Sequence, residues 1–182
     1  MIDPIVTPRL TLRSFAESDL PDYHDLFARP DVVRYLYLEP LDRDGALSLL
    51  RRRMAQGDLD SDGGLVLAIE LREPSPRVIG EIMLWIKDRK NRQAEIGFVL
   101  HPEYQRRGFA REAASAVLDH AFGPANLHRV YGRTDGRNDA SAGLMRSLGM
   151  RQEAHFRENE IFKGAWGDEL IFAILEGEWR AP

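Results

Sequence analysis

The chain has 182 residues, 43% hydrophobic and 30% charged, with no cysteine and a formal net charge of −4. These numbers predict one globular domain over residues 1–182, exclude disulfides, thiolate metal sites and a cysteine nucleophile, and disfavour wholesale nucleic-acid binding. The lack of cysteine fits a cytoplasmic protein, and no apolar run approaches the length that crosses a membrane.

Hydrophobic periodicity predicts strands and helices that share one sheet. In chain order we expect a strand at 9–15, helices at 17–28 and 42–57, a loop at 57–64, strands at 65–71, 78–86 and 93–100, a helix ending near 122, a strand at 128–134, a helix at 138–149 and two final strands that turn near 163–164. The three arginines at 51–53 are expected on the solvated side of their helix. The order indicates a mixed α/β or α+β layer system.

The entry to the helix that ends near 122 carries an unusual charge pattern. Arg106, Arg107 and then Gly108 stand where acidic residues or a polar cap are expected, because a helix begins with a partial positive charge. Free backbone N–H groups, a glycine that permits close approach and two guanidinium groups together predict a phosphate or pyrophosphate ligand. The stretch matches neither GxxxxGK[ST] nor GxGxxG.

The loop and its surroundings resemble the GNAT superfamily of N-acetyltransferases. "QRRGFA" at 105–110 is similar to the family motif Q/R-x-x-G-x-G/A, with alanine as its last residue. The segment at 138–150 resembles the family's helix after strand five, and segments at 9–20, 95–102 and the C-terminus resemble the RimJ/RimL branch, so the resemblance covers nearly the whole chain. It implies acetyl-coenzyme A as cosubstrate. The residues implied in its binding are Phe98, Val99, Leu100, Gln105, Arg106, Arg107, Gly108, Phe109, Ala110, Arg111, Asn138 and Ser141. No metal is expected, because the five histidines are scattered and form no HExxH or comparable pair.

The fold that the resemblance implies agrees with the predicted order of elements. It is an α/β (α+β) fold with a mixed, mostly antiparallel sheet of six to seven strands, flanked by helices. Its fourth and fifth strands, here 93–100 and 128–134, splay apart. The pantetheine arm is expected in that gap, along the exposed edge at 97–100, like an added strand.

The resemblance also implies direct attack of an amine on the thioester in a ternary complex. A backbone N–H of Phe98 or Val99 is expected to polarise the carbonyl. Ser141 is the candidate donor to the leaving thiolate, because Met145 stands where many members have a tyrosine acid. Asn138 is a good N-cap, with a role in holding the cofactor arm as the alternative.

Glutamates are the candidates for the base that removes the proton from the amine. Glu160 lies on the penultimate strand, with an ordinary exposed glutamate as its alternative interpretation. Glu103 before the loop and Glu95 on the strand 93–100 are the others, whereas Glu112 is expected to cap its helix or pair with an arginine. A protein α-amine, with a pKa of about 7.7 to 8.0, needs less help from a base than a lysine near 10.4.

The leading interpretation is an acetyl-CoA-dependent N-acetyltransferase. Its acceptor is a primary amine, either a protein N-terminal α-amine or a small molecule, and Tyr35, Tyr37 and Trp85 are candidates for lining the acceptor pocket. A non-catalytic acyl-CoA-binding module is the alternative, since it needs the arginine loop but no acid or base. DNA and membrane partners are not expected, and a homodimer is left open.

Overall fold

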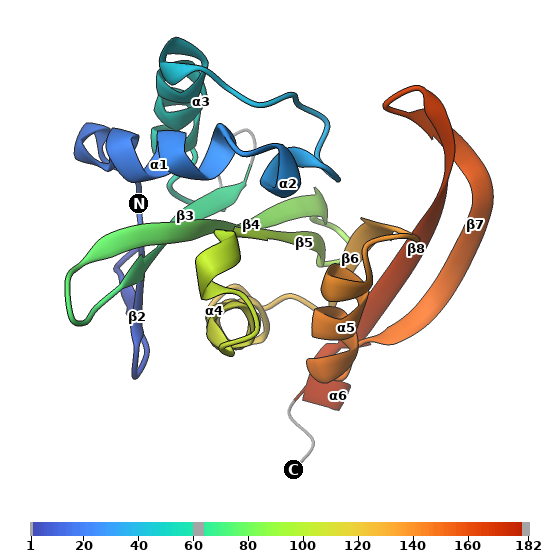
Figure 1. Ribbon diagram of the computed structural model, residues 1–182. Coiled ribbons are helices and arrows are strands. Elements are labelled where there is room, and N and C mark those ends of the chain that lie inside the picture. The colour runs from blue at the N-terminus through green and yellow to red at the C-terminus, as the bar shows by residue number, and fades with distance from the viewer. Residues whose placement is uncertain (1, 60–63, 180–182) are drawn as a thin grey trace.

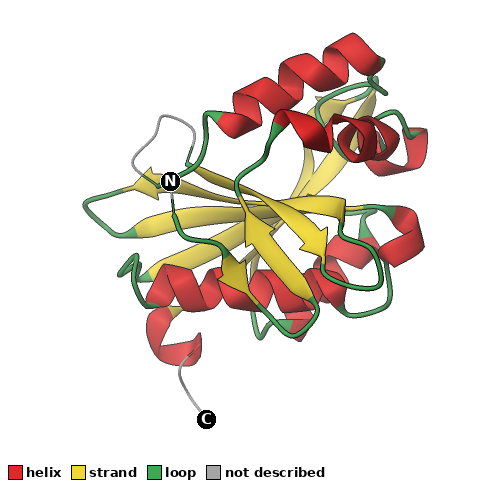
Figure 2. Ribbon diagram, turned by 90° about the vertical axis from the view of Figure 1, so that its left-hand side faces the viewer, coloured by secondary structure: helices red, strands yellow, loops and turns green. Residues whose placement is uncertain are grey.

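The computed structural model describes residues 2–59 and 64–179, and its strands form one sheet between two helical layers (Figures 1 and 2). The strands are β1 (Ile5–Val6), β2 (Leu10–Arg13), β3 (Leu65–Leu71), β4 (Arg77–Asp88), β5 (Gln93–Leu100), β6 (Arg129–Asp135), β7 (Arg151–Phe162) and β8 (Ala165–Leu175). The helices are α1 (Leu20–Phe27), α2 (Pro30–Val33), α3 (Arg43–Met54), α4 (Phe109–Phe122), α5 (Asp139–Ser147) and α6 (Glu176–Trp179). Short 3-10 turns occupy Glu17–Asp19 and Pro102–Tyr104.

In the described part of the chain the sheet has eight strands in the order β1-β2-β3-β4-β5-β6-β8-β7. Neighbouring strands are antiparallel except β5 and β6, which run parallel. The predicted mixed, mostly antiparallel sheet is thus confirmed, and β3 and β5 have the predicted bounds. The count exceeds the predicted six to seven because β1 spans two residues, too few for a periodic pattern. Residues 60–63 of the predicted loop lie outside the described residues.

Helices cover the two faces of the sheet unequally. Figure 1 shows α1 and α3 on one face of the first strands, with α4, α5 and α6 on the other. Successive residues of β3 therefore enter different cores: Leu65 and Leu67 pack with α4, and Val66 and Ala68 pack with α1 and α3. This double burial explains the continuous apolar run of the strand.

The prediction that all three arginines at 51–53 lie on the solvated side of the helix is wrong for Arg53. Its guanidinium donates to both carboxylate oxygens of Glu81, at 3.0 and 3.2 Å, and Glu81 is only 1% exposed. The hydroxyl of Tyr23 donates to the same carboxylate at 3.0 Å. Arg51 is exposed as predicted. Three successive residues spread over about 200° of the circumference of a helix, so one of the three lies toward the sheet.

Strands β5 and β6 pair over only three residues and then diverge. The parallel pairs run from Gln93↔Arg129 to Glu95↔Tyr131. Beyond them β5 continues along β4, and β6 continues along β8. The predicted splay of these strands is confirmed, and it leaves one edge of β5 beyond Glu95 without a partner among the described strands.

The last two strands form a long hairpin that curves away from the body of the sheet (Figure 1). Its turn is at Lys163 and Gly164, which have φ angles of +48° and +83°, as the sequence predicted. The Lys163 ammonium donates to the carbonyls of Val33 and Leu38, at 3.1 and 2.9 Å. The tip of the hairpin is thereby tied to α2 and the segment after it. Among the described helices none is long and apolar enough to cross a membrane.

Candidate active site

A cavity of about 660 Å³ opens where β5 and β6 diverge. Residues of β4, β5, β6, α5, β7, β8 and the segment after α2 line it, so elements from both ends of the chain meet there. Tyr35, Tyr37 and Trp85, the aromatic residues considered for the acceptor pocket, all contribute to its wall. The cavity therefore connects the gap between the splayed strands to the hairpin β7–β8.

The backbone of Phe98 faces the gap between β5 and β6. The His101 N–H donates to the Ile79 carbonyl at 2.8 Å, which makes these two residues a hydrogen-bonded pair of the antiparallel ladder. Alternation along the ladder then turns the backbone of Val99 toward β4 and that of Phe98 away from it. In agreement, a Cβ on Gly80 would collide with the Val99 carbonyl. Of the two expected donors, Phe98 is the one that presents its N–H to the gap.

Helix α5 brings its first turn to the same gap. The Asn138 side chain accepts a hydrogen bond from the Ser141 N–H at 3.1 Å, so Asn138 caps the helix. Ser141 lines the cavity, and its hydroxyl has no hydrogen-bond partner among the described residues. Met145, at the position where the resemblance implies a tyrosine acid, has a side chain that is 1% exposed and has no proton to donate. Its sulfur would lie 2.6 Å from a Cβ at position 132, so Gly132 makes room for it.

Glu160 lies at the hairpin side of the cavity. It accepts a 2.5 Å hydrogen bond from the Tyr37 hydroxyl, and the bonded oxygen is Oε1. Tyr37 as a residue is 71% exposed, but its hydroxyl lies at the cavity, where burial and the bond to Glu160 raise its pKa to about 12. Tyr37 therefore stays protonated as a donor. The second oxygen of Glu160 has no partner within the described residues and can accept a proton or a hydrogen bond.

The other carboxylates of the cavity wall are already paired with cations. Glu95 is buried and bonds to Lys87 at 3.0 Å and to Arg133 at 3.1 Å. Arg133 also bonds to Glu169 at 2.9 Å. Glu103 is exposed on the 3-10 turn before the loop and does not line the cavity. Of the three candidate bases, only Glu160 thus combines a place in the cavity with an unpaired oxygen.

The loop at 105–110 turns sharply into α4. Arg106 and Gly108 have φ angles of +56° and +82°, and Gly108 is the N-cap of the helix. The first bond into the helix runs from the Glu112 N–H to the Gly108 carbonyl at 3.0 Å. Within the described chain, the six N–H groups of residues 106–111 donate no hydrogen bond. Successive unbonded N–H groups at a helix start form a site for an anion.

Some of the predicted loop residues bond or pack within the protein, and others carry charged groups that are free to bind a ligand. The Gln105 side chain donates to the Leu100 carbonyl at 3.0 Å and so ties the loop to the end of β5. The Phe109 ring is buried beneath the Arg107 guanidinium, at 5.2 Å. The free groups are exposed and have no carboxylate partner within 2–59 and 64–179; they are the guanidinium groups of Arg106, Arg107 and Arg111.

Two contacts of the site were not predicted from the sequence. The hydrogen bond of Tyr37 to Glu160 joins residues 123 positions apart. Arg9 contacts Glu112 and the loop from the other end of the chain. The sequence offered no signal for either partner, since a lone tyrosine or arginine has no periodicity. In the described part no group of three or more histidine, aspartate or glutamate side chains is placed to hold a metal.

Comparison with known proteins agrees with this geometry. The family model of the acetyltransferase (GNAT) domain matches residues 9–151. The uncharacterized N-acetyltransferase YnaD of Bacillus subtilis is 31% identical over 176 residues, which cover 97% of this chain and 99% of that protein. Spermidine N(1)-acetyltransferase of Vibrio cholerae is 25% identical over 171 residues, covering 94% and 95% of the two chains.

Solved structures of the same fold include a GNAT-family acetyltransferase from Bacillus anthracis. It superposes with a TM-score of 0.85 at 28% identity, over 97% of this chain and all of that chain (100%). Spermidine N-acetyltransferase from Vibrio cholerae, solved with CoA and spermine, has a TM-score of 0.78 at 24% identity, over 96% and 100% of the two chains. The class that this fold and these relatives define is that of acetyl-CoA-dependent N-acetyltransferases. The chain belongs to the GNAT family of acetyltransferases.

Proposed function

We propose that this enzyme transfers the acetyl group of acetyl-CoA directly to a small primary amine bound in the same cavity. The observation that carries the proposal is the set of groups that face that cavity. The free backbone of Phe98 lies at one side, and the unpaired oxygen of Glu160 lies at the other. Both reactants therefore have a place in one ternary complex, and their positioning supplies much of the catalysis.

The cofactor is proposed to bind along β5 and the start of α4. The unbonded N–H groups of residues 106–111 and the guanidinium groups of Arg106 and Arg107 would hold the diphosphate. The pantetheine arm would follow the free edge of β5, where Phe98 offers both N–H and C=O. In this placement the thioester reaches the wide part of the gap, beside Ser141.

The residues of the cavity then have separate roles in the transfer. The neutral amine attacks the thioester carbonyl, and the N–H of Phe98 stabilises the oxyanion. The carbon–nitrogen bond forms, the carbon–sulfur bond breaks, and Glu160 accepts the proton that the amine loses, directly or through a water. The Ser141 hydroxyl donates to the leaving thiolate, because Met145 has no proton to give.

Two observations support a small molecule as the acceptor. The hairpin tip and the segment after α2 are tied together over the cavity through Lys163, which restricts the approach of a folded protein. Relatives that match over nearly their whole length are named spermidine N(1)-acetyltransferases. A protein N-terminal α-amine is the second candidate, supported by the resemblance to the RimJ/RimL branch.

A thiol-release assay with acetyl-CoA tests the proposal. The acceptor panel contains aliphatic monoamines, polyamines, amino acids, and peptides with a free α-amine or only a lysine amine. We expect turnover with at least one small amine and slower turnover with the peptides. Calorimetry with acetyl-CoA accompanies the assay: tight binding without turnover on any amine would identify a non-catalytic acyl-CoA-binding module. A failure to bind acetyl-CoA would refute the cofactor placement itself.

A further inference from the structure

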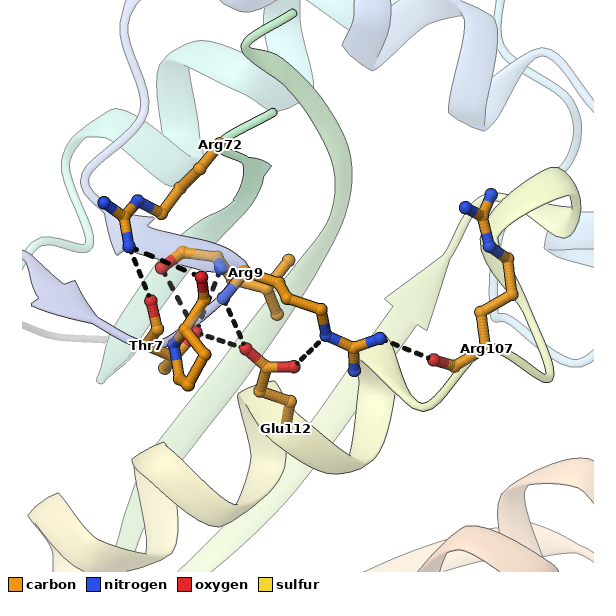
Figure 3. Close-up of polar contacts among 7 residues, drawn as sticks. Thr7, Arg9, Arg72, Arg107 and Glu112 are labelled. Carbon is orange, nitrogen blue, oxygen red and sulfur yellow. Dashed lines mark hydrogen bonds and ion pairs between the residues drawn. The ribbon is translucent and has the colours of Figure 1, made fainter. Parts of the chain in front are cut away.

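Arg9 lies against the loop at 105–110 although it precedes that loop by almost a hundred residues (Figure 3). Its Nε donates to Glu112 Oε2 at 2.6 Å, and its backbone N–H donates to Glu112 Oε1 at 2.9 Å. Its Nη1 donates to the Arg107 carbonyl at 2.9 Å. One side chain therefore joins the segment before β2, the turn of the loop and the first turn of α4.

The carboxylate of Glu112 is held in its ionised form at this point. The hydroxyl of Thr7 donates to Oε1 at 2.7 Å, in addition to the two bonds from Arg9. Burial alone would raise the pKa of Glu112, but these hydrogen bonds outweigh burial and lower the pKa below its ordinary value. Arg72 fixes the segment from behind by donating to the Thr7 carbonyl at 3.0 Å (Figure 3).

A carboxylate in the first turn of α4 opposes the proposed ligand. An acidic residue stabilises a helix start in isolation, but it repels a diphosphate that binds to the same N–H groups. Arg9 offsets that charge through its short ion pair with Glu112, whose side chain is 15% exposed. The loop thereby keeps the net positive charge of Arg106, Arg107 and Arg111.

The bond to the Arg107 carbonyl also fixes the direction of a loop peptide. In a trans peptide the C=O of residue 107 and the N–H of residue 108 point to opposite sides. Because Arg9 holds the carbonyl on its own side, the N–H of Gly108 points away from Arg9. Figure 3 shows the Arg107 side chain also extending away from Glu112. The Arg9 guanidinium packs over the Phe109 ring, at 4.4 Å from the ring centre, at the start of α4.

We propose that Arg9 is a positioning residue for the diphosphate of coenzyme A. Arg9 cancels the charge of Glu112 and orients the peptide between residues 107 and 108. The proposal rests on the proposed function, because it takes this loop as the diphosphate site. It assigns Arg9 no contact with the reacting atoms. The acetyl transfer step itself is therefore expected to proceed at its normal rate once acetyl-CoA is bound.

Titration of purified variants with coenzyme A and with pantetheine, which lacks the diphosphate, tests the proposal. Arg9→Gln is expected to raise the Kd for coenzyme A and the KM for acetyl-CoA by roughly tenfold, because a carboxylate near the phosphates loses its counter-charge. The kcat and the Kd for pantetheine should stay within about twofold of the wild type. The double variant Arg9→Gln/Glu112→Gln removes both charges and should recover much of the affinity for coenzyme A.

Arg72→Gln is the matched control, because it disturbs the same segment without contacting the loop. An equal loss of affinity in this control would show that Arg9 merely supports the fold, and no recovery in the double variant would refute the cancellation of the Glu112 charge. If Arg9→Gln does not fold, Arg9→Lys, which keeps the charge but loses the fork of donors, should give a smaller loss that is again confined to coenzyme A. An unchanged preference for coenzyme A over pantetheine would overturn the proposal for Arg9. The proposed function fails separately, if the wild-type protein does not bind acetyl-CoA.

Discussion

Glu160 differs from the other carboxylates of the cavity because it has no cationic partner among the described residues. Glu95 and Glu169 have cationic partners, whereas within the described residues Glu160 is bonded only to a neutral phenol, through one oxygen. Both carboxylate oxygens of Glu95 and of Glu169 already accept hydrogen bonds, whereas Glu160 keeps one oxygen free to approach the proton of the amine. This contrast makes Glu160 the residue at which to test proton transfer.

Glu160→Gln is expected to lower kcat by about 10²- to 10⁴-fold for an alkylamine, the usual contribution of a general base. The Kd for acetyl-CoA should not change. Because the loss concerns the proton of the amine, it should shrink as the pH is raised toward the pKa of the acceptor. Steady-state rates between pH 7 and pH 10 measure this, with Glu169→Gln as the control at a paired carboxylate. A pH-independent loss would assign Glu160 to binding of the acceptor.

At the scale of elements, the sequence predicted features that depend on neighbouring residues and missed contacts between elements that are far apart in the chain. The bounds of β3 and β5 followed from local composition, because each is a short, largely apolar segment that begins directly after a polar loop or turn. The loop at 105–110 was recognisable since all its parts are adjacent in the sequence. Arg53 was placed wrongly. The pairing of Glu112 with an arginine was predicted, but Arg9 was not identified as its partner, and the partner of Glu160 was not found. Each of these depends on packing between elements that are distant in the chain, which no local pattern encodes.

The ion pair between Arg53 of α3 and Glu81 of β4 fixes that helix to the wall of the cavity. Met83 and Trp85 follow Glu81 at alternate positions of β4 and line the cavity, so they lie on the same face as the ion pair. Burial raises the pKa of Glu81, although the Arg53 guanidinium opposes this shift. The pair is therefore costly to desolvate but more costly to break.

Glu81→Gln is expected to lower the free energy of unfolding by about 3 kcal/mol, because it leaves the Arg53 guanidinium buried without a counter-charge. Replacing both residues with methionine should restore most of that loss, since apolar side chains of similar volume often substitute for a buried ion pair without cost. Urea unfolding of Arg53→Met, Glu81→Met and the double variant Arg53→Met/Glu81→Met measures the coupling. Additive losses would show that solvent already screens the pair.

At the scale of the whole molecule, the sheet consists of two parts that meet over three residue pairs. Strands β1 to β5 form one part and β6 to β8 the other, and the parallel pairs from Gln93↔Arg129 to Glu95↔Tyr131 join them. On the face of the sheet covered by α4 and α5, one continuous core spans both parts. On the other face, α1 and α3 cover only the first part. A cofactor in the gap would contact both parts at their weakest junction. Its binding should therefore stabilise the fold as a whole.

Thermal unfolding with coenzyme A measures this coupling. At a ligand concentration of 100 times Kd, binding adds about 2.7 kcal/mol of stability. For a chain of this size that gain raises Tm by roughly 5 to 10 °C. Gly108→Glu should abolish the rise, because a carboxylate then stands among the N–H groups that hold the diphosphate. A side chain at a φ of +82° is strained in any case, so Gly108→Gln serves as the neutral control with the same shape. The control should start from a similarly lowered Tm yet keep part of the rise; an equal rise in both variants would place the diphosphate elsewhere.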